Sequence, residues 1–146
     1  MSNGKSIIGI VGSANKDGRT NEHVVAALEG CKRKGAATEL IQLSDHVVEP
    51  CHDCLPWVCK DELHCTYEDP AFEFLTEKLL GCSGLVFGTP IYWWDLSAMV
   101  KYLILKMFRV FAMTSPANGI PALGIGIAGG TGNGLATGLK PLYHFF

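Results

Sequence analysis

The side chains best suited to chemistry fall into two groups. Small polar residues and glycines fill residues 12–21, directly after the apolar run of residues 7–11. This group predicts an anion site, because a strand, a tight polar turn and a helix N-terminus leave unpaired backbone N–H groups facing a ligand. The second group offers four soft ligands to a metal. Its members are Cys51, Cys54, Cys59 and Cys65.

The predicted anion site follows neither of the common nucleotide-binding patterns. Five residues separate Gly12 from Gly18 where the P-loop has four, and Arg19 stands in place of its lysine. The dinucleotide fingerprint GxGxxG is also missing from this turn. Hydroxyls, amides and backbone N–H groups, with the Arg19 guanidinium, instead suit one terminal phosphate. The alternative is a solvated turn with Thr20 as the N-cap of the next helix.

Two further segments could contact the rest of such a ligand. Residues 89–95 read Thr-Pro-Ile-Tyr-Trp-Trp-Asp, and their rings offer flat surfaces for a planar group. Residues 129–134 are rich in glycine, which lets the backbone approach a ligand closely. A phosphate at one end and a flat heteroaromatic ring at the other describe flavin mononucleotide (FMN). Alternatively, Trp93 and Trp94 are core residues or an oligomer contact, which is the commoner role of tryptophan.

The elements that must position these segments alternate along the chain. Apolar runs predict strands at residues 7–11, 38–43, 84–88 and 120–128. Helical periodicity predicts helices at residues 21–34, 70–81 and 97–110, and from Leu135 onward. This alternation predicts a doubly wound parallel α/β sheet in one domain, residues 1–146. Because loops at the carboxyl ends of such strands share one rim, the three ligand segments should converge.

Composition argues against several classes of protein. A net charge of −2 over 146 residues offers no basic surface to nucleic acid. The uncharged residues 111–139 hold prolines and many glycines, which argues against a membrane-spanning helix. The N-terminus lacks a signal-peptide pattern. Six cysteines then indicate a reducing compartment, so we expect a cytoplasmic protein with free or metal-bound thiols.

Three motifs taken together resemble one known family. They are Gly12-Ser13-x4-Gly18-x-Thr20, Gly88-Thr89-Pro90-Ile91-Tyr92 and Gly129-Gly130. They are similar to the phosphate loop GSxRxxGxT, the ring-contacting segment G-[ST]-P-[IV]-Y and the later glycine turn of the NADPH-dependent FMN reductase family, which is flavodoxin-like. The resemblance implies FMN bound by Ser13, Asn15, Gly18, Arg19, Thr20, Asn21, Thr89, Pro90, Ile91, Tyr92, Trp93, Gly129, Gly130, Thr131 and Gly132.

The same resemblance implies an activity. The chain would be an oxidoreductase that passes electrons between a reduced carrier, NAD(P)H or ferredoxin, and a small acceptor. The flavin would carry the redox chemistry, and no side chain is predicted to be catalytic. Its partner would be a small molecule or a redox protein, and the family commonly forms dimers and tetramers. One alternative is a non-enzymatic electron carrier of flavodoxin type.

The chain departs from the family pattern in two respects. The family usually has arginine at the position of Asn15 and asparagine or a similar residue where Arg19 stands, so the positive charge has moved along the loop. Flavodoxin-like sheets have five strands, whereas the pattern predicts four. We therefore expect a chain that lacks the last strand and helix and leaves residues 120–128 as an exposed edge.

The cysteine loop, residues 44–68, resembles the iron–sulfur flavoprotein branch of the family. Its spacing, Cys51-x2-Cys54-x4-Cys59-x5-Cys65, departs from the compact CxxCxxC arrangement, because Trp57 occupies the third position. A [4Fe-4S] cluster, a zinc ion and a packed loop of free thiols remain alternatives. A zinc-stabilised binding module without flavin is the corresponding alternative for the whole chain.

Overall fold

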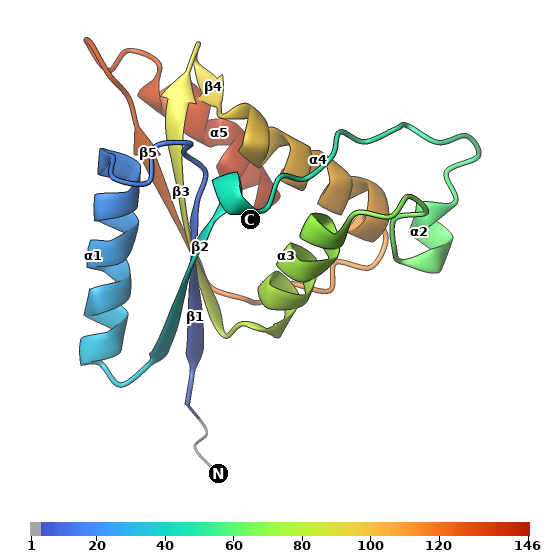
Figure 1. Ribbon diagram of the computed structural model, residues 1–146, viewed down its shortest axis with the longest axis horizontal. Coiled ribbons are helices and arrows are strands. Elements are labelled where there is room, and N and C mark those ends of the chain that lie inside the picture. Colours follow the sequence, from blue (N-terminus) through green and yellow to red (C-terminus); the bar gives the residue numbers. More distant parts are fainter. Residues whose placement is uncertain (1–3) are drawn as a thin grey trace.

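A central sheet of four parallel strands and one short antiparallel strand organises the protein (Figure 1). The computed structural model describes residues 4–146. The strands are β1 (Ser6–Val11), β2 (Ala37–Gln42), β3 (Gly84–Tyr92), β4 (Asp95–Leu96) and β5 (Ala122–Ile127). β1 pairs in parallel with β2 and β3, β5 pairs in parallel with the far side of β3, and the short β4 folds back antiparallel on β3. The predicted doubly wound parallel sheet is confirmed.

Helices cover both faces of this sheet (Figure 1). Helix α1 (Arg19–Arg33) lies on one face, and α3 (Pro70–Gly81), α4 (Ala98–Phe111) and α5 (Leu135–Phe145) lie on the other. The short η1 (Leu43–Asp45) and α2 (Cys59–Glu62) belong to the cysteine loop. No helix in the described part of the chain is long and apolar enough to cross a membrane.

The alternation of side chains along β1 divides the core between the two faces. Ile8 and Ile10 join the larger core with Phe87 on the side of α3, α4 and α5. Val11 packs with Val24 on the side of α1. Apolar residues on both faces of a strand are expected where helices cover both sides of a parallel sheet. β1 therefore reads as a nearly continuous apolar run.

β3 extends further than the predicted strand of residues 84–88. It continues to Tyr92 and pairs with β5 as far as Pro90 opposite Ile127, although β1 has already ended at Val11 opposite Gly88. Pro90 is tolerated because the strand on its β1 side has stopped and requires no N–H donor there. Residues 89–92, predicted to be loop, are therefore strand.

The remaining observations concern helix termini, cysteine burial and the edge of the sheet. Helix α1 begins at Arg19, and Gly18 rather than Thr20 is its N-cap residue. Cys82 is buried and lies just after α3, and Cys31 is partly buried within α1. Among the described residues β5 pairs only with β3, and its Leu123 is exposed, as expected of an edge strand.

Candidate functional site

The polar loop after β1 is fixed at its start by two neighbouring elements. The Gly12 N–H donates to the Gly88 carbonyl of β3 at 2.7 Å, and the Ser97 hydroxyl donates to the Gly12 carbonyl at 2.6 Å. A Cβ atom on Gly12 would lie 2.2 Å from Cγ2 of Val100, so only glycine fits between β3 and α4. The loop therefore leaves the sheet at the rim predicted from the sequence.

Asparagine and serine side chains hold the rest of this loop in a tight turn. The Ser13 hydroxyl accepts from the Asn15 N–H at 3.2 Å, and Asn15 Oδ1 accepts from the Asp17 N–H at 3.1 Å. Gly18 then begins α1 without a side chain that could cap the helix. The first N–H groups of a helix have no intrahelical partner. Here they and the positive end of the helix dipole remain suited to an anion.

Two tryptophans form the turn between β3 and β4. Trp93 and Trp94 have φ angles of 52° and 62°, so both lie in the left-handed region, as in a type I′ hairpin turn. This turn usually takes Asn-Gly, and bulky residues there store strain that is characteristic of ligand sites. Trp93 is 89% exposed.

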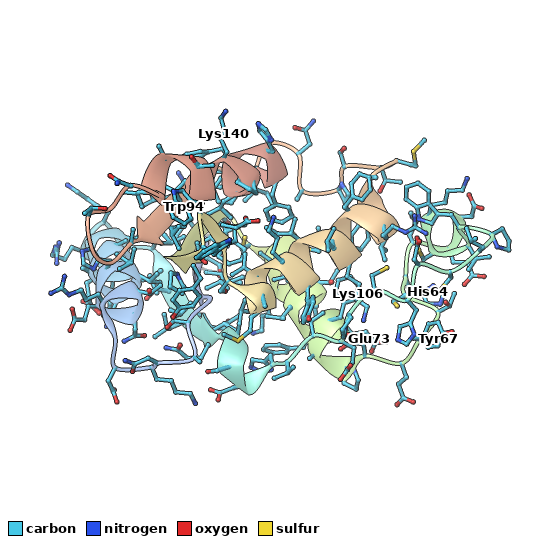
Figure 2. The ribbon with its side chains drawn as sticks, turned by 90° about the horizontal axis from the view of Figure 1, so that it is seen from above. His64, Tyr67, Glu73, Trp94, Lys106 and Lys140 are labelled. Carbon is cyan, nitrogen blue, oxygen red and sulfur yellow. The ribbon has the colours of Figure 1, made fainter. Side chains whose placement is uncertain are left out.

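Trp94 connects this aromatic turn to the glycine loop after β5. A Cβ atom on Gly134 would lie 3.2 Å from Cδ1 of Trp94, so the indole packs on glycine backbone. Figure 2 shows Trp94 beside the start of α5. The second and third predicted segments therefore meet, and glycine at position 134 allows the contact.

A cavity of about 530 Å³ opens where the three loops converge. Its volume falls in the range of small-molecule and cofactor sites. It lies beyond the carboxyl ends of β1, β3 and β5, near the switch in strand order between β1 and β3. Its lining residues are Ser13, Asn15, Gly18, Arg19, Thr20, Pro90, Ile91, Tyr92, Trp93, Ile127 and Gly129.

Ten of the fifteen residues predicted to contact FMN line this cavity, and so does Ile127, which the sequence analysis did not name. Ile127 ends β5 opposite Pro90, and only the pairing register reveals that it reaches the rim. Five predicted residues do not line the cavity: Asn21, Thr89, Gly130, Thr131 and Gly132. Asn21 Oδ1 instead accepts from Gln42 Nε2 at 2.6 Å, and the buried Thr89 hydroxyl donates to the Pro90 carbonyl and accepts from the Ser97 N–H.

The cysteine loop is anchored to α4 through Arg109. The Arg109 carbonyl accepts from Trp57 Nε1 at 2.6 Å and from Cys59 Sγ at 3.5 Å. Its guanidinium lies over the Trp57 ring, donates to the Cys54 carbonyl at 3.4 Å and pairs with Asp53 at 3.0 Å. One residue of α4 thus holds both the backbone and the side chains of the loop.

This anchoring does not fit a four-cysteine metal site. Cys59 is buried, and its thiol points to the Arg109 carbonyl. Within residues 4–146, no group of three or more His, Cys, Asp or Glu side chains lies close enough to hold a metal ion. The predicted ligands Cys51, Cys54, Cys59 and Cys65 are therefore not assembled. The physical reason is that Trp57, at the position of the third cysteine, packs on Arg109 and brings Cys59 with it.

We predict that the cysteine loop folds without metal. Incubation of the purified protein with a strong chelator should leave its melting temperature unchanged, whereas a structural metal site would contribute folding energy. Cys59→Ala should lower the free energy of unfolding by about 1 kcal/mol, as for other small buried side chains. Thermal unfolding with and without chelator, beside iron and zinc analysis, checks this. Stoichiometric metal that is lost in Cys59→Ala would contradict it.

A buried ion pair joins the end of the cysteine loop to the middle of α4. Asp69 caps α3 by accepting from the Phe72 N–H at 3.0 Å, and it also accepts from the Glu49 N–H at 3.0 Å. Lys106 of α4, which is labelled in Figure 2, donates to the same carboxylate. Both side chains are at most 3% exposed. Burial alone would raise the pKa of the Asp69 carboxyl, but these hydrogen bonds and the charge of Lys106 hold it below its ordinary value.

Comparison with known proteins agrees with this geometry. The family model described as NADPH-dependent FMN reductase matches residues 6–145. The chain belongs to this family. The resemblance noted in the sequence is therefore confirmed. Gly18 and Pro90 of this FMN reductase family chain line the same cavity.

Two archaeal proteins are among the relatives of this FMN reductase family chain. An iron-sulfur flavoprotein of Methanocaldococcus jannaschii is 32% identical over 143 residues, which cover 96% of this chain and 70% of that protein. An iron-sulfur flavoprotein of Methanosarcina thermophila is 32% identical over 97 residues, or 66% of this chain and 49% of the relative. The match thus spans about half of the second relative's length.

Solved structures show the same fold at low sequence identity. An NAD(P)H:quinone oxidoreductase from Methanothermobacter marburgensis superposes with a TM-score of 0.72 at 16% identity, covering 97% of this chain and 76% of that one. RosB with a bound intermediate superposes with a TM-score of 0.73 at 17% identity, covering 97% and 58%. At these identities the likeness supports the fold alone.

Proposed function

We propose that the protein binds FMN in the rim cavity and is a flavin-dependent oxidoreductase that takes electrons from NAD(P)H or ferredoxin. One observation carries the proposal: a single cavity has an uncapped helix N-terminus at one end and exposed aromatic residues at the other. This matches a ligand with a phosphate at one end and a planar ring system at the other. Family membership supports the same ligand.

The phosphate would lie against the loop after β1. Ser13, Thr20 and the backbone N–H groups at the start of α1 supply neutral donors there. Arg19 adds a positive charge on the cavity lining. Charge-assisted hydrogen bonds to a phosphate are about twice as strong as neutral ones, so Arg19 would contribute most per contact.

The ring would lie between the end of β3 and the end of β5. Pro90, Ile91 and Ile127 line this part with apolar surface, and Tyr92 and Trp93 add rings. When bound, FMN would supply the chemistry of accepting and releasing electrons. The chain would orient the ring, exclude water from its apolar face and leave one side open to a donor. No side chain on the cavity is required as an acid or base.

A binding titration tests the ligand. We expect FMN to bind the apo-protein with quenching of flavin fluorescence, and riboflavin, which lacks the phosphate, to bind at least about tenfold more weakly, since one charge-assisted contact is worth about 1.5–3 kcal/mol. Equal affinity for the two flavins would remove the phosphate site from the proposal. No binding of FMN would overturn the proposal as a whole.

We predict that Arg19→Ala weakens FMN binding by about five- to tenfold and leaves the affinity for riboflavin unchanged. The substitution removes a cation at a solvent-exposed position, where its interaction with a phosphate contributes about 1 kcal/mol. Lys16→Ala is the matched control, since Lys16 is a cation of the same loop that pairs with Asp45 and does not line the cavity. Isothermal titration of each variant with both flavins checks this. An equal loss of FMN affinity in the two variants would show that the effect comes from net charge and not from a contact between Arg19 and the phosphate.

The electron donor distinguishes an enzyme from a carrier. Steady-state oxidation of NADPH or NADH by the FMN-loaded protein, with a quinone as acceptor, would support the enzyme. Slow turnover with both nucleotides, together with rapid electron exchange with reduced ferredoxin, would instead support a flavodoxin-type carrier. The proposal includes no iron–sulfur cluster, because the four cysteines, all within the described residues, are not assembled around one point.

A further inference from the structure

The serine that begins α4 does not cap its own helix. Ser97 is the N-cap residue of α4, a position where serine is favoured because its hydroxyl normally accepts from the first N–H groups of the helix. Its side chain makes no such bond here. The hydroxyl instead donates to the Gly12 carbonyl at 2.6 Å, 85 residues away in the chain, and Ser97 is only 3% exposed. This buried hydroxyl therefore serves the loop after β1 and not α4.

The Ser97 hydroxyl fixes one peptide plane of that loop. A trans peptide is planar and its carbonyl and N–H point in opposite directions, so the Gly12 carbonyl and the Ser13 N–H are oriented together. Because the carbonyl points to Ser97, the Ser13 N–H points away from it. Glycine offers little steric resistance to rotation of the backbone at position 12, so this orientation depends on the hydrogen bond.

The Ser13 N–H is available to a ligand. Ser13 lines the rim cavity and is 5% exposed. Its hydroxyl accepts from the Asn15 N–H, but its own N–H donates to no group within residues 4–146. Backbone N–H groups that are buried without an acceptor are rare in folded proteins. A ligand in the cavity would supply the acceptor that this N–H lacks.

A second buried hydroxyl holds Ser97 in place. The Thr89 hydroxyl accepts from the Ser97 N–H at 3.3 Å and donates to the Pro90 carbonyl at 3.0 Å, and Thr89 is fully buried. Pro90 lines the part of the cavity proposed for the flavin ring, whereas Thr89 and Ser97 do not line the cavity. The two hydroxyls thus connect the backbone at Pro90 to the backbone at Gly12.

We propose that Ser97 is a positioning residue for the flavin phosphate, an inference that rests on the proposed binding of FMN. Its hydrogen bond to the Gly12 carbonyl keeps the Ser13 N–H available to the phosphate. Thr89 holds Ser97, and through it the loop after β1, at a fixed distance from the backbone at Pro90. Ser97 acts through the backbone of the loop and does not itself contact the ligand.

A purely structural role for Ser97 leads to a different expectation. Loss of a buried hydrogen bond lowers the stability of the protein whatever its function, because the Gly12 carbonyl is left without a donor. A general loss of stability would weaken the binding of FMN and riboflavin alike. Loss of a correctly oriented N–H would weaken the binding only of the flavin that carries a phosphate. The ratio of the two affinities therefore separates the two roles.

Titration of apo-protein with FMN and with riboflavin tests the proposal. Ser97→Ala should raise the dissociation constant of FMN about tenfold, as expected for one hydrogen bond to a charged group, and change that of riboflavin by less than about twofold. Ser97→Cys nearly keeps the size of the side chain and has a weak donor, so it should give a smaller loss that is again confined to FMN. The same comparison with riboflavin applies to this variant if Ser97→Ala does not fold.

Cys82→Ala is the matched control for these variants. Cys82 is also buried and donates to a backbone carbonyl, that of Leu79 at 3.3 Å. It precedes β3, whereas the cavity lies beyond the opposite end of that strand. Its removal should lower stability and leave the affinities for both flavins unchanged.

Nuclear magnetic resonance of isotope-labelled apo-protein tests the orientation of the peptide without flavin. Inorganic phosphate should shift the Ser13 amide proton of the wild type downfield, as a new hydrogen bond forms. The same addition should leave this resonance in place in Ser97→Ala. Cys82→Ala should respond as the wild type does.

The outcomes that overturn the proposal differ from those that overturn the binding of FMN. An unchanged preference for FMN over riboflavin in Ser97→Ala, or an unchanged response of its Ser13 amide to phosphate, would remove the role of Ser97. Equal losses for the two flavins would also overturn it, because they would show a structural role only. Failure of the proposed function is seen in the wild type itself, which would bind no FMN or bind both flavins equally.

Discussion

Asp69→Asn should lower the free energy of unfolding by about 3–5 kcal/mol, because it leaves the Lys106 ammonium buried without a counter-charge. Domains of this size are stable by only about 5–15 kcal/mol, so this loss would be a large share of the total stability. Asparagine keeps a single acceptor oxygen, so the variant also loses one of the two hydrogen bonds from the Phe72 and Glu49 N–H groups. Urea unfolding followed by circular dichroism measures it.

Two control variants separate the buried charge from the network as a whole. The double variant Asp69→Asn with Lys106→Met should recover part of the lost stability, since an apolar side chain replaces the unpaired ammonium. Lys78→Met breaks the partly exposed pair with Glu39 and should cost at most about 1 kcal/mol. A double variant as unstable as the single one would contradict the assigned role of Lys106.

Acid should weaken the wild-type protein more steeply than the Asp69→Asn variant. The pKa of Asp69 is lower in the folded state, so the unfolded state binds more protons in the acid range. The contribution of Asp69 to stability is then complete above the ordinary carboxyl pKa of about 3.9 and is lost as pH falls through the folded value. Unfolding curves between about pH 3 and about pH 6 check this. Parallel acid profiles of the two proteins would contradict it.

Trp93→Asn should stabilise the apo-protein by about 1 kcal/mol and lower its affinity for FMN by about 5- to 100-fold. Asparagine is favoured at this left-handed turn position, whereas tryptophan is strained there. Because Trp93 is exposed, its removal costs little packing. It does remove a ring from the proposed flavin site, where one stacking contact is worth about 1–3 kcal/mol. Urea unfolding of apo-protein and flavin titration measure the two effects.

Trp93→Phe is the matched control for this prediction. It keeps a ring and the unfavourable φ angle, so apo-stability should stay near that of the wild type and most FMN affinity should remain. If Trp93→Asn instead destabilised the apo-protein and left FMN affinity unchanged, the turn would be a structural element and not part of the ligand site.

Local patterns in the chain determined the order of elements and most of the rim. The apolar run of β1, the Asp69-Pro70 start of α3 and the glycines around the first loop each express a local backbone preference, which needs no distant partner. Because parallel strands place their carboxyl ends together, these local features also predicted that the loops containing Ser13, Tyr92 and Gly129 would meet.

Tertiary structure alone decided which of the predicted site residues already form hydrogen bonds to other parts of the protein. Asn21 and Thr89 have the residue types of ligand contacts, but Gln42 and Ser97 engage them across the fold. Cys59 has the residue type of a metal ligand, but its thiol is directed to the carbonyl of Arg109, 50 residues further along the chain. Only folding brings such distant residues together, so no local pattern reports that a donor or acceptor is already paired.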